Sequence, residues 1–129
     1  MRLLLDTHAL LWALAEPDRL SARAADLIRS PTNVVFVSAA SAWEIATKHR
    51  IGRLPGAGPI LAGFTAHLAT LRAEELPISA VHALRAGSFV VDHRDPFDRM
   101  LAAQAVVEGV ALLTDDPAFS AFPELRTVW

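Results

Sequence analysis

Short apolar runs alternate with longer segments along the chain. The first run, Leu3–Leu5, lies between Arg2 and Asp6, and a second, Val34–Val37, follows a proline-containing turn. Runs of this length between polar residues are typical of strands buried on both faces. On this pattern and its turn signals we predict strands at residues 2–5, 34–37, 75–78, 110–114 and 126–128.

The segments between the predicted strands carry helix signals. Ser21 and Ser79 are N-cap residues, Pro31 follows the end of one helical segment, and Gly52 and Gly109 follow the ends of two others. Residues 54–59 and 93–96 read as a loop and a polar turn. The predicted helices span residues 7–14, 21–30, 38–51, 60–71, 79–86 and 97–108.

Strands that alternate with helices favour a parallel sheet with helices on both faces. We therefore expect an α/β fold, a three-layer α/β/α sandwich whose mostly parallel central sheet has four or five strands. The 129 residues suffice for one domain, and neither a repeat nor a linker interrupts them. The prediction is a single domain over residues 1–129.

The composition excludes several kinds of site. The chain has no Cys, so disulfides, thiolate metal sites and Cys nucleophiles are absent. Its apolar runs are too short for a membrane span, and its start lacks the features of a signal peptide. We expect a cytoplasmic protein with no membrane contact. The 53% hydrophobic content indicates apolar surface that a partner or a second copy covers.

Four acidic residues stand at or near the ends of apolar elements. Asp6 follows the first strand, Glu44 lies in the third helix, Asp98 is in the first turn after Pro96, and Asp116 follows the fourth strand. Parallel strands end at one edge of the sheet, where the next helices begin. Four carboxylates at that edge would repel one another, and a hard divalent ion such as Mg²⁺ or Mn²⁺ relieves the repulsion.

Each aspartate also has a purely structural explanation. Asp6 and Asp116 are good N-cap residues for the segments that follow them. Asp95 before a proline is a further N-cap, and Asp98 in the first turn favours the helix dipole. Taken one at a time, these aspartates are more often structural than catalytic.

Glu44 has two structural alternatives of its own. Ser41 and Glu44 match the spacing of a capping box, and Glu44 is also placed to pair with Lys48 one turn later. Ser38 is an equally good cap directly after the strand. A helix that starts there places Glu44 nearly two turns inside, where it cannot act as a cap.

Four segments of the chain together resemble a known family. They are Leu4–Trp12, Ser41–Ile45, His93–Ala105 and Leu113–Asp116 with Phe119. In this order they closely resemble a PIN-domain protein, most of all the VapC-type toxins of bacterial type II toxin–antitoxin systems. The resemblance covers essentially the whole chain.

The resemblance implies a site built on the four acids. Asp6 and Asp98 would bind Mg²⁺ or Mn²⁺ directly, while Glu44 and Asp116 would bind through water, hold a second ion or orient the nucleophile. The residues that would support this metal site are Thr7, Asp95, Thr114 and Asp115. The candidates for contact with RNA phosphates are Lys48, Arg50, Arg53, Arg94 and Arg99.

The activity implied by the resemblance is that of a metal-dependent endoribonuclease. It also implies a VapB-type antitoxin whose tail blocks the site, and a homodimer. The resemblance does not identify the RNA that is cut, the number of metal ions or the role of His8.

Three other functions remain as alternatives. A haloacid-dehalogenase-like phosphatase also begins with a buried strand and an aspartate, but it needs a second aspartate where this chain has His8. A solitary PIN nuclease would have no antitoxin. A non-catalytic RNA-binding module would carry a degraded site, whereas all four acids are present here.

Overall fold

The computed structural model describes residues 1–129 and contains a five-stranded sheet in which all strands are parallel. The strand order is β3-β2-β1-β4-β5, so β1 lies at the centre between β2 and β4. The predicted α/β fold with a parallel sheet is therefore confirmed. The strands are β1 (Arg2–Leu5), β2 (Val34–Ser38), β3 (Ala73–Leu76), β4 (Ala111–Leu113) and β5 (Thr127–Val128).

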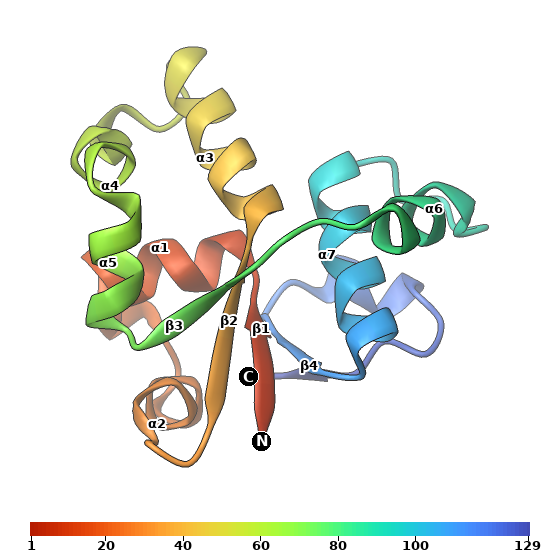
Figure 1. Ribbon diagram of the computed structural model, residues 1–129, viewed down its shortest axis with the longest axis horizontal. Coiled ribbons are helices and arrows are strands. Elements are labelled where there is room, and N and C mark those ends of the chain that lie inside the picture. Colours follow the sequence, from red (N-terminus) through yellow and green to blue (C-terminus); the bar gives the residue numbers. More distant parts are fainter.

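Helices cover both faces of the sheet. Figure 1 shows α1, α2, α4 and α5 on one side and α6 and α7 on the other, while α3 continues upward from the end of β2. No helix combines the length and apolar character needed to cross a membrane. The α-helices are α1 (Thr7–Ala15), α2 (Ala22–Arg29), α3 (Ala39–Arg50), α4 (Gly58–Ala62), α5 (Phe64–Thr70), α6 (Ala80–Ser88) and α7 (Pro96–Glu108). Short 3₁₀ helices occupy Pro17–Arg19, Pro55–Ala57 and Pro117–Ala121.

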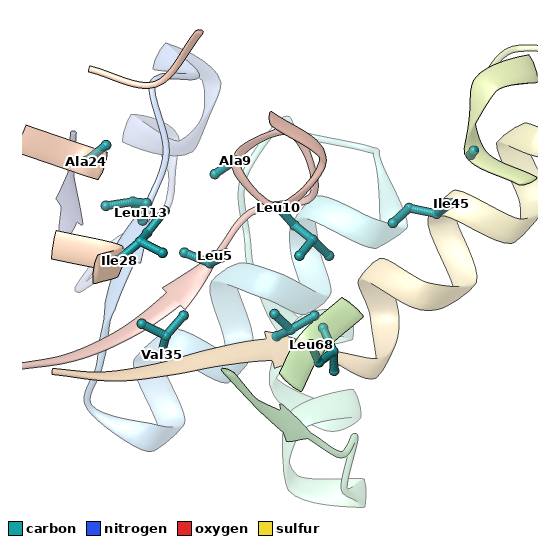
Figure 2. Packing of buried hydrophobic residues seen from close by; sticks show 11 residues of the cluster. Leu5, Ala9, Leu10, Ala24, Ile28, Val35, Ile45, Leu68 and Leu113 are labelled. Atoms are coloured by element: carbon teal, nitrogen blue, oxygen red, sulfur yellow. The ribbon is translucent and has the colours of Figure 1, made fainter. Parts of the chain in front are cut away.

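Two apolar clusters form the core, one on each face of the sheet. Successive side chains of a strand point to opposite faces, so Leu5 and Leu113 join the cluster under α1 and α2, while Leu4 and Leu112 join the one under α7. Figure 2 shows the first cluster, where Leu10 of α1 also packs. Each fully buried leucine contributes about 2 kcal/mol, which fixes the ends of β1 and β4 firmly in place.

Two predicted elements differ from the structure. The helix expected over residues 60–71 is broken at Gly63 into α4 and α5, and α4 already begins at Gly58 inside the expected loop. Gly63 adopts φ −133° and ψ 43°, which is not helical. The strand expected at residues 75–78 lies two residues earlier. It ends before Pro77, which has no N–H to donate to a sheet.

Candidate active site

Asp6 lies directly after β1, and its two carboxylate oxygens have different partners. Oδ1 accepts a hydrogen bond from the Ala9 backbone N–H at 2.7 Å and so caps α1. Oδ2 accepts one from the Thr114 hydroxyl, which follows β4. The side chain is 3% exposed. Burial raises the pKa of Asp6, although both hydrogen bonds oppose the rise.

Thr114 connects Asp6 to Asp116. Its hydroxyl also accepts a hydrogen bond from the Asp116 backbone N–H at 3.0 Å. Asp116 caps the 3₁₀ helix that follows, because its Oδ1 accepts from the Ala118 N–H at 2.9 Å. Asp115 is exposed, and its charge contributes to the raised pKa of Asp6. The structure thus brings Asp6, Thr114 and Asp116 together.

Glu44 is buried in the second turn of α3. The helix is capped by Ser38, whose hydroxyl accepts from the Ala40 N–H at 2.9 Å, so the capping box of Ser41 and Glu44 does not form. Glu44 Oε2 instead pairs with Lys48 on the next turn. Its other oxygen, Oε1, is buried with no hydrogen-bond partner. A buried carboxylate oxygen without a partner is costly.

The α3 helix is tied to α1 beside this glutamate. The Ser41 hydroxyl lies 3.0 Å from the Thr7 hydroxyl, and the two share a hydrogen bond. Both side chains are buried. This contact holds the helix that carries Glu44 against the helix that Asp6 caps. Thr7, which the resemblance placed beside the metal, is thus a link between two helices.

Asp98 lies in the first turn of α7. Asp95 caps this helix, its Oδ1 accepting from the backbone N–H groups of Phe97 and Asp98. The Asp98 Oδ2 is 3.0 Å from His93 Nε2. Burial raises the pKa of Asp98 to about 6, and the charges of Asp95 and Glu44 add to the rise. The α3 and α7 helices contact one another beside these acids, where the ring centroids of Trp43 and Phe97 are 4.7 Å apart.

The four predicted acids therefore meet as two groups. Asp6 and Asp116 are joined through Thr114, and Glu44 and Asp98 interact through their charges. No three His, Asp or Glu side chains are arranged to hold one ion together. Mg²⁺ commonly uses one or two protein carboxylates and completes its shell with water, so pairs of acids are a suitable donor set.

The chemistry of these residues fits a hard divalent ion. Burial raises the pKa of both Asp6 and Asp98 by removing water from their charged forms, and Glu44 Oε1 has no donor at all. Lys48 is the one Lys or Arg side chain paired with any of the four acids. A divalent cation would supply the missing positive charge, and carboxylate oxygens are the ligands that Mg²⁺ and Mn²⁺ prefer.

The arginines predicted to bind RNA separate into two kinds. Arg50, Arg53 and Arg94 are exposed, and their side chains make no hydrogen bond within the chain. Arg99 is half-buried, and its guanidinium donates to backbone carbonyls of residues 86–93. The structure does not place Arg99 for contact with RNA, because its donors are already used.

The sequence patterns did not indicate the role of Gln104. This residue is fully buried in α7, where its Oε1 accepts from the Ser38 hydroxyl and its Nε2 donates to the Pro77 carbonyl at 3.3 Å. It therefore fixes α7 against the start of α3. A lone polar residue within the apolar segment Leu101–Val107 was the available signal for such a buried link.

Three solved structures share this fold over nearly the whole chain. VapBC2 from Rickettsia felis, bound to a DNA fragment from its promoter, has TM-score 0.69 and 18% identity, covering 99% of this chain and 98% of that chain. VapBC-1 from nontypeable Haemophilus influenzae has TM-score 0.65 and 18% identity, covering 99% and 97%. VapC20 from Mycobacterium tuberculosis, a toxin that cleaves the sarcin-ricin loop, has TM-score 0.60 and 23% identity, covering 96% and 98%.

The family assignment rests on the sequence as a whole. No curated protein has a matching sequence. A family model described as the PIN domain, however, matches residues 3–125, which include all four acids and both groups that they form. The match agrees with the resemblance of the four segments and with the all-parallel sheet, and it leaves the phosphatase alternative without support. The chain belongs to the PIN domain family.

Proposed function

We propose that this protein is a metal-dependent endoribonuclease that acts as the toxin of a toxin–antitoxin pair. The observation that carries the proposal is the set of buried, undercompensated carboxylates around Asp6, Glu44 and Asp98. Membership in the PIN domain family and the likeness to three VapBC or VapC structures, one of them a toxin that cleaves the sarcin-ricin loop, support it.

Asp6 and Asp98 are the proposed direct ligands of Mg²⁺ or Mn²⁺. A bound ion of this kind activates a water molecule and stabilises charge on the attacked phosphate. Asp6 keeps its orientation through the Ala9 N–H, and Asp116 offers an Oδ2 with no partner in the chain. Glu44 Oε1 is a further unpaired acceptor and would orient the nucleophilic water or hold a second ion.

Arg50, Arg53 and Arg94 are the proposed contacts for RNA phosphates. Each guanidinium is exposed and free of partners within the chain. Arg50 and Arg53 lie at and just beyond the end of α3, the helix that carries Glu44, while Arg94 immediately precedes the cap of α7. Contacts with phosphates position a strand and carry no base specificity, so these residues do not identify the RNA.

A VapB-type antitoxin and a second copy of this chain are the proposed protein partners. Two of the similar structures are VapBC proteins, a name that joins toxin and antitoxin. Several large apolar side chains of this chain are exposed, and such surface is often covered in an assembly. A solitary nuclease remains the alternative, and co-purification with the product of a small neighbouring gene would separate the two.

The substitution Asp6→Asn tests the proposed reaction. Asparagine is also a good N-cap, so we expect the fold to persist while cleavage falls at least about 100-fold through loss of a metal ligand. The measurement is cleavage of total RNA by the purified protein in Mg²⁺, together with growth inhibition on expression. Asp26→Asn in the exposed part of α2 is the matched control and should cleave like the wild type.

The metal dependence is tested in the same assay. EDTA should stop cleavage by the wild-type protein, and added Mn²⁺ should restore it. Cleavage that continues in EDTA, or that survives Asp6→Asn at the wild-type rate, would contradict the assignment of these carboxylates as metal ligands.

A further inference from the structure

His93 makes a directed contact with one oxygen of Asp98. The His93 Nε2 lies 3.0 Å from the Asp98 Oδ2. An ionised carboxylate can only accept hydrogen bonds, so the imidazole is the donor. The other oxygen, Oδ1, has no hydrogen-bond partner in the chain. The contact therefore fixes the carboxylate group and leaves one oxygen available.

The His93 ring is itself held by aromatic neighbours. It stacks on Phe119 with ring centroids 6.3 Å apart and lies 5.3 Å from Phe122. Both phenylalanines belong to the apolar core under α7. The imidazole thus projects from a rigid surface, and a half-buried Asp98 receives its donor from a fixed direction.

Arg99 holds the backbone that carries His93. Its Nη1 donates to the His93 carbonyl at 2.9 Å, its Nε to the Ala86 carbonyl at 2.9 Å and its Nη2 to the Phe89 carbonyl at 2.7 Å. The planar guanidinium has five N–H donors in a fixed geometry, so these contacts secure residues 86–93 against α7. Asp98 and Arg99 are neighbours in the sequence. Asp98 contacts the imidazole of His93, and Arg99 contacts its backbone carbonyl.

We propose that His93 is a positioning residue for Asp98, and that Arg99 acts through His93 by fixing its main chain. The proposal rests on the proposed function, in which Asp98 binds the metal ion. A hydrogen bond to Oδ2 holds the carboxylate and leaves Oδ1 as the oxygen that would bind the ion. Partners of this kind commonly change metal affinity by 10–100-fold. Arg99 would then serve catalysis through its backbone contacts, without touching RNA.

The test measures Mn²⁺ binding to the metal-free protein by calorimetry, together with RNA cleavage. His93→Ala should weaken Mn²⁺ affinity by about 10–100-fold and lower kcat with little change in KM. His93→Gln retains a donor at a similar reach and should recover most of the loss. His67→Ala is the control, because His67 lies in α5 and its ring contacts the carbonyl of Gly63, the N-cap of that helix, and none of the four acids. Wild-type Mn²⁺ affinity in folded His93→Ala would overturn the proposal.

The link through Arg99 is tested by a double-mutant cycle. Arg99→Lys should weaken Mn²⁺ binding in the wild-type background and have little further effect in His93→Ala, because both changes release the same carboxylate. Fully additive losses would overturn the role assigned to Arg99. If Arg99→Lys does not fold, His93→Ala still decides whether His93 positions Asp98.

A readout without metal separates this proposal from the proposed function. Side-chain coupling constants measured by NMR should show one χ1 rotamer for Asp98 in the wild type, averaging in His93→Ala and one rotamer again in His93→Gln. Unchanged couplings would overturn the positioning role. A wild-type protein that binds no Mn²⁺ and cuts no RNA would instead overturn the proposed function, and the Asp98 couplings would still decide the role of His93.

Discussion

Three aspartates of the site each cap a helix with one oxygen, which leaves the other oxygen for a different contact. In Asp6, Asp95 and Asp116, Oδ1 accepts the backbone N–H of the following helix. Asp6 Oδ2 turns to Thr114, while the Oδ2 of Asp116 has no partner in the chain. The structural and functional explanations of these residues are therefore compatible, because a carboxylate has two oxygens and a cap uses only one.

Asp98 makes stability depend on pH, because its pKa rises from 3.8 to about 6 on folding. The folded protein binds this proton more tightly than the unfolded chain does. The stabilisation from Asp98 is thus fully present below about pH 4 and is lost as the pH rises through about 6. The loss is at most about 3 kcal/mol. In a variant that lacks the Asp98 charge, the contact with His93 and the attraction to the N-terminus of α7 would both be weaker. These losses would offset part of any gain in stability.

Asp98→Asn should therefore stabilise the metal-free protein at pH 8 by about 1–2 kcal/mol while removing RNA cleavage. At pH 4 the same variant should show no gain. The measurement is urea unfolding at both pH values, with Asp26→Asn as a control that changes neither. An equal effect at pH 4 and pH 8 would show that the Asp98 charge is not the cause.

At the scale of single elements, Ser38 both caps a helix and makes a buried contact with another helix. Its hydroxyl caps α3 and also bonds Gln104 of α7, and both side chains are fully buried. Ser38→Ala should lower the free energy of unfolding by about 2–3 kcal/mol, since it removes a cap and leaves a buried amide oxygen without a partner.

The matched control is Ser21→Ala, which removes only the cap of α2 and should cost about 1 kcal/mol. Chemical unfolding of both variants gives the comparison. Equal losses for the two serines would mean that the bond to Gln104 contributes nothing. A larger loss for Ser38→Ala should come with weaker Mn²⁺ binding, because the helix that carries Glu44 is then less firmly held.

Apolar runs predict the elements of this fold well where both faces are buried. Leu3–Leu5 and Val34–Val37 are such runs, and β1 and β2 lie where they were expected. The edge strand β3 is different, because its Ala73–Leu76 segment has exposed glutamates at its centre and no buried run to mark it. The largely apolar pattern over residues 60–71 likewise predicted one helix and did not reveal the break at Gly63, which depends on backbone geometry.

At the scale of the whole molecule, one exposed apolar surface stands out on α6. Val81 is 59% exposed and Leu84 74% exposed, and Val90 just beyond the helix is fully exposed. We expect this surface to contribute to the proposed homodimer. Leu84→Glu should weaken self-association about tenfold or more, as measured by sedimentation velocity over a range of concentrations.

The control for this substitution is Ile51→Glu, which places the same charge on an exposed apolar residue after α3. It should leave self-association unchanged if α6 provides the contact. A wild-type protein that sediments as a monomer at all concentrations would remove the homodimer from the proposal and leave the ribonuclease site unaffected.

The arrangement of the site could be predicted only in part. The order of strands and helices led to the expectation that Asp6, Glu44, Asp98 and Asp116 lie near one edge of a parallel sheet, and the structure links Asp6 with Asp116 through Thr114. The contact of Asp6 with Thr114 could not be derived from local patterns, because it depends on the register of β1 against β4. Glu44 Oε1 is buried without a hydrogen-bond partner because of the way α3 packs. The periodicity of the sequence does not predict this packing.

The central place of β1 in the sheet also has a consequence for synthesis. Asp6 is synthesised 108 residues before Thr114, its partner. The strand β4 that pairs with β1 is equally late, so a chain that stops before residue 111 lacks both β4 and Asp116. The acidic edge is therefore complete only after β4 and Asp116 have been synthesised and have joined β1.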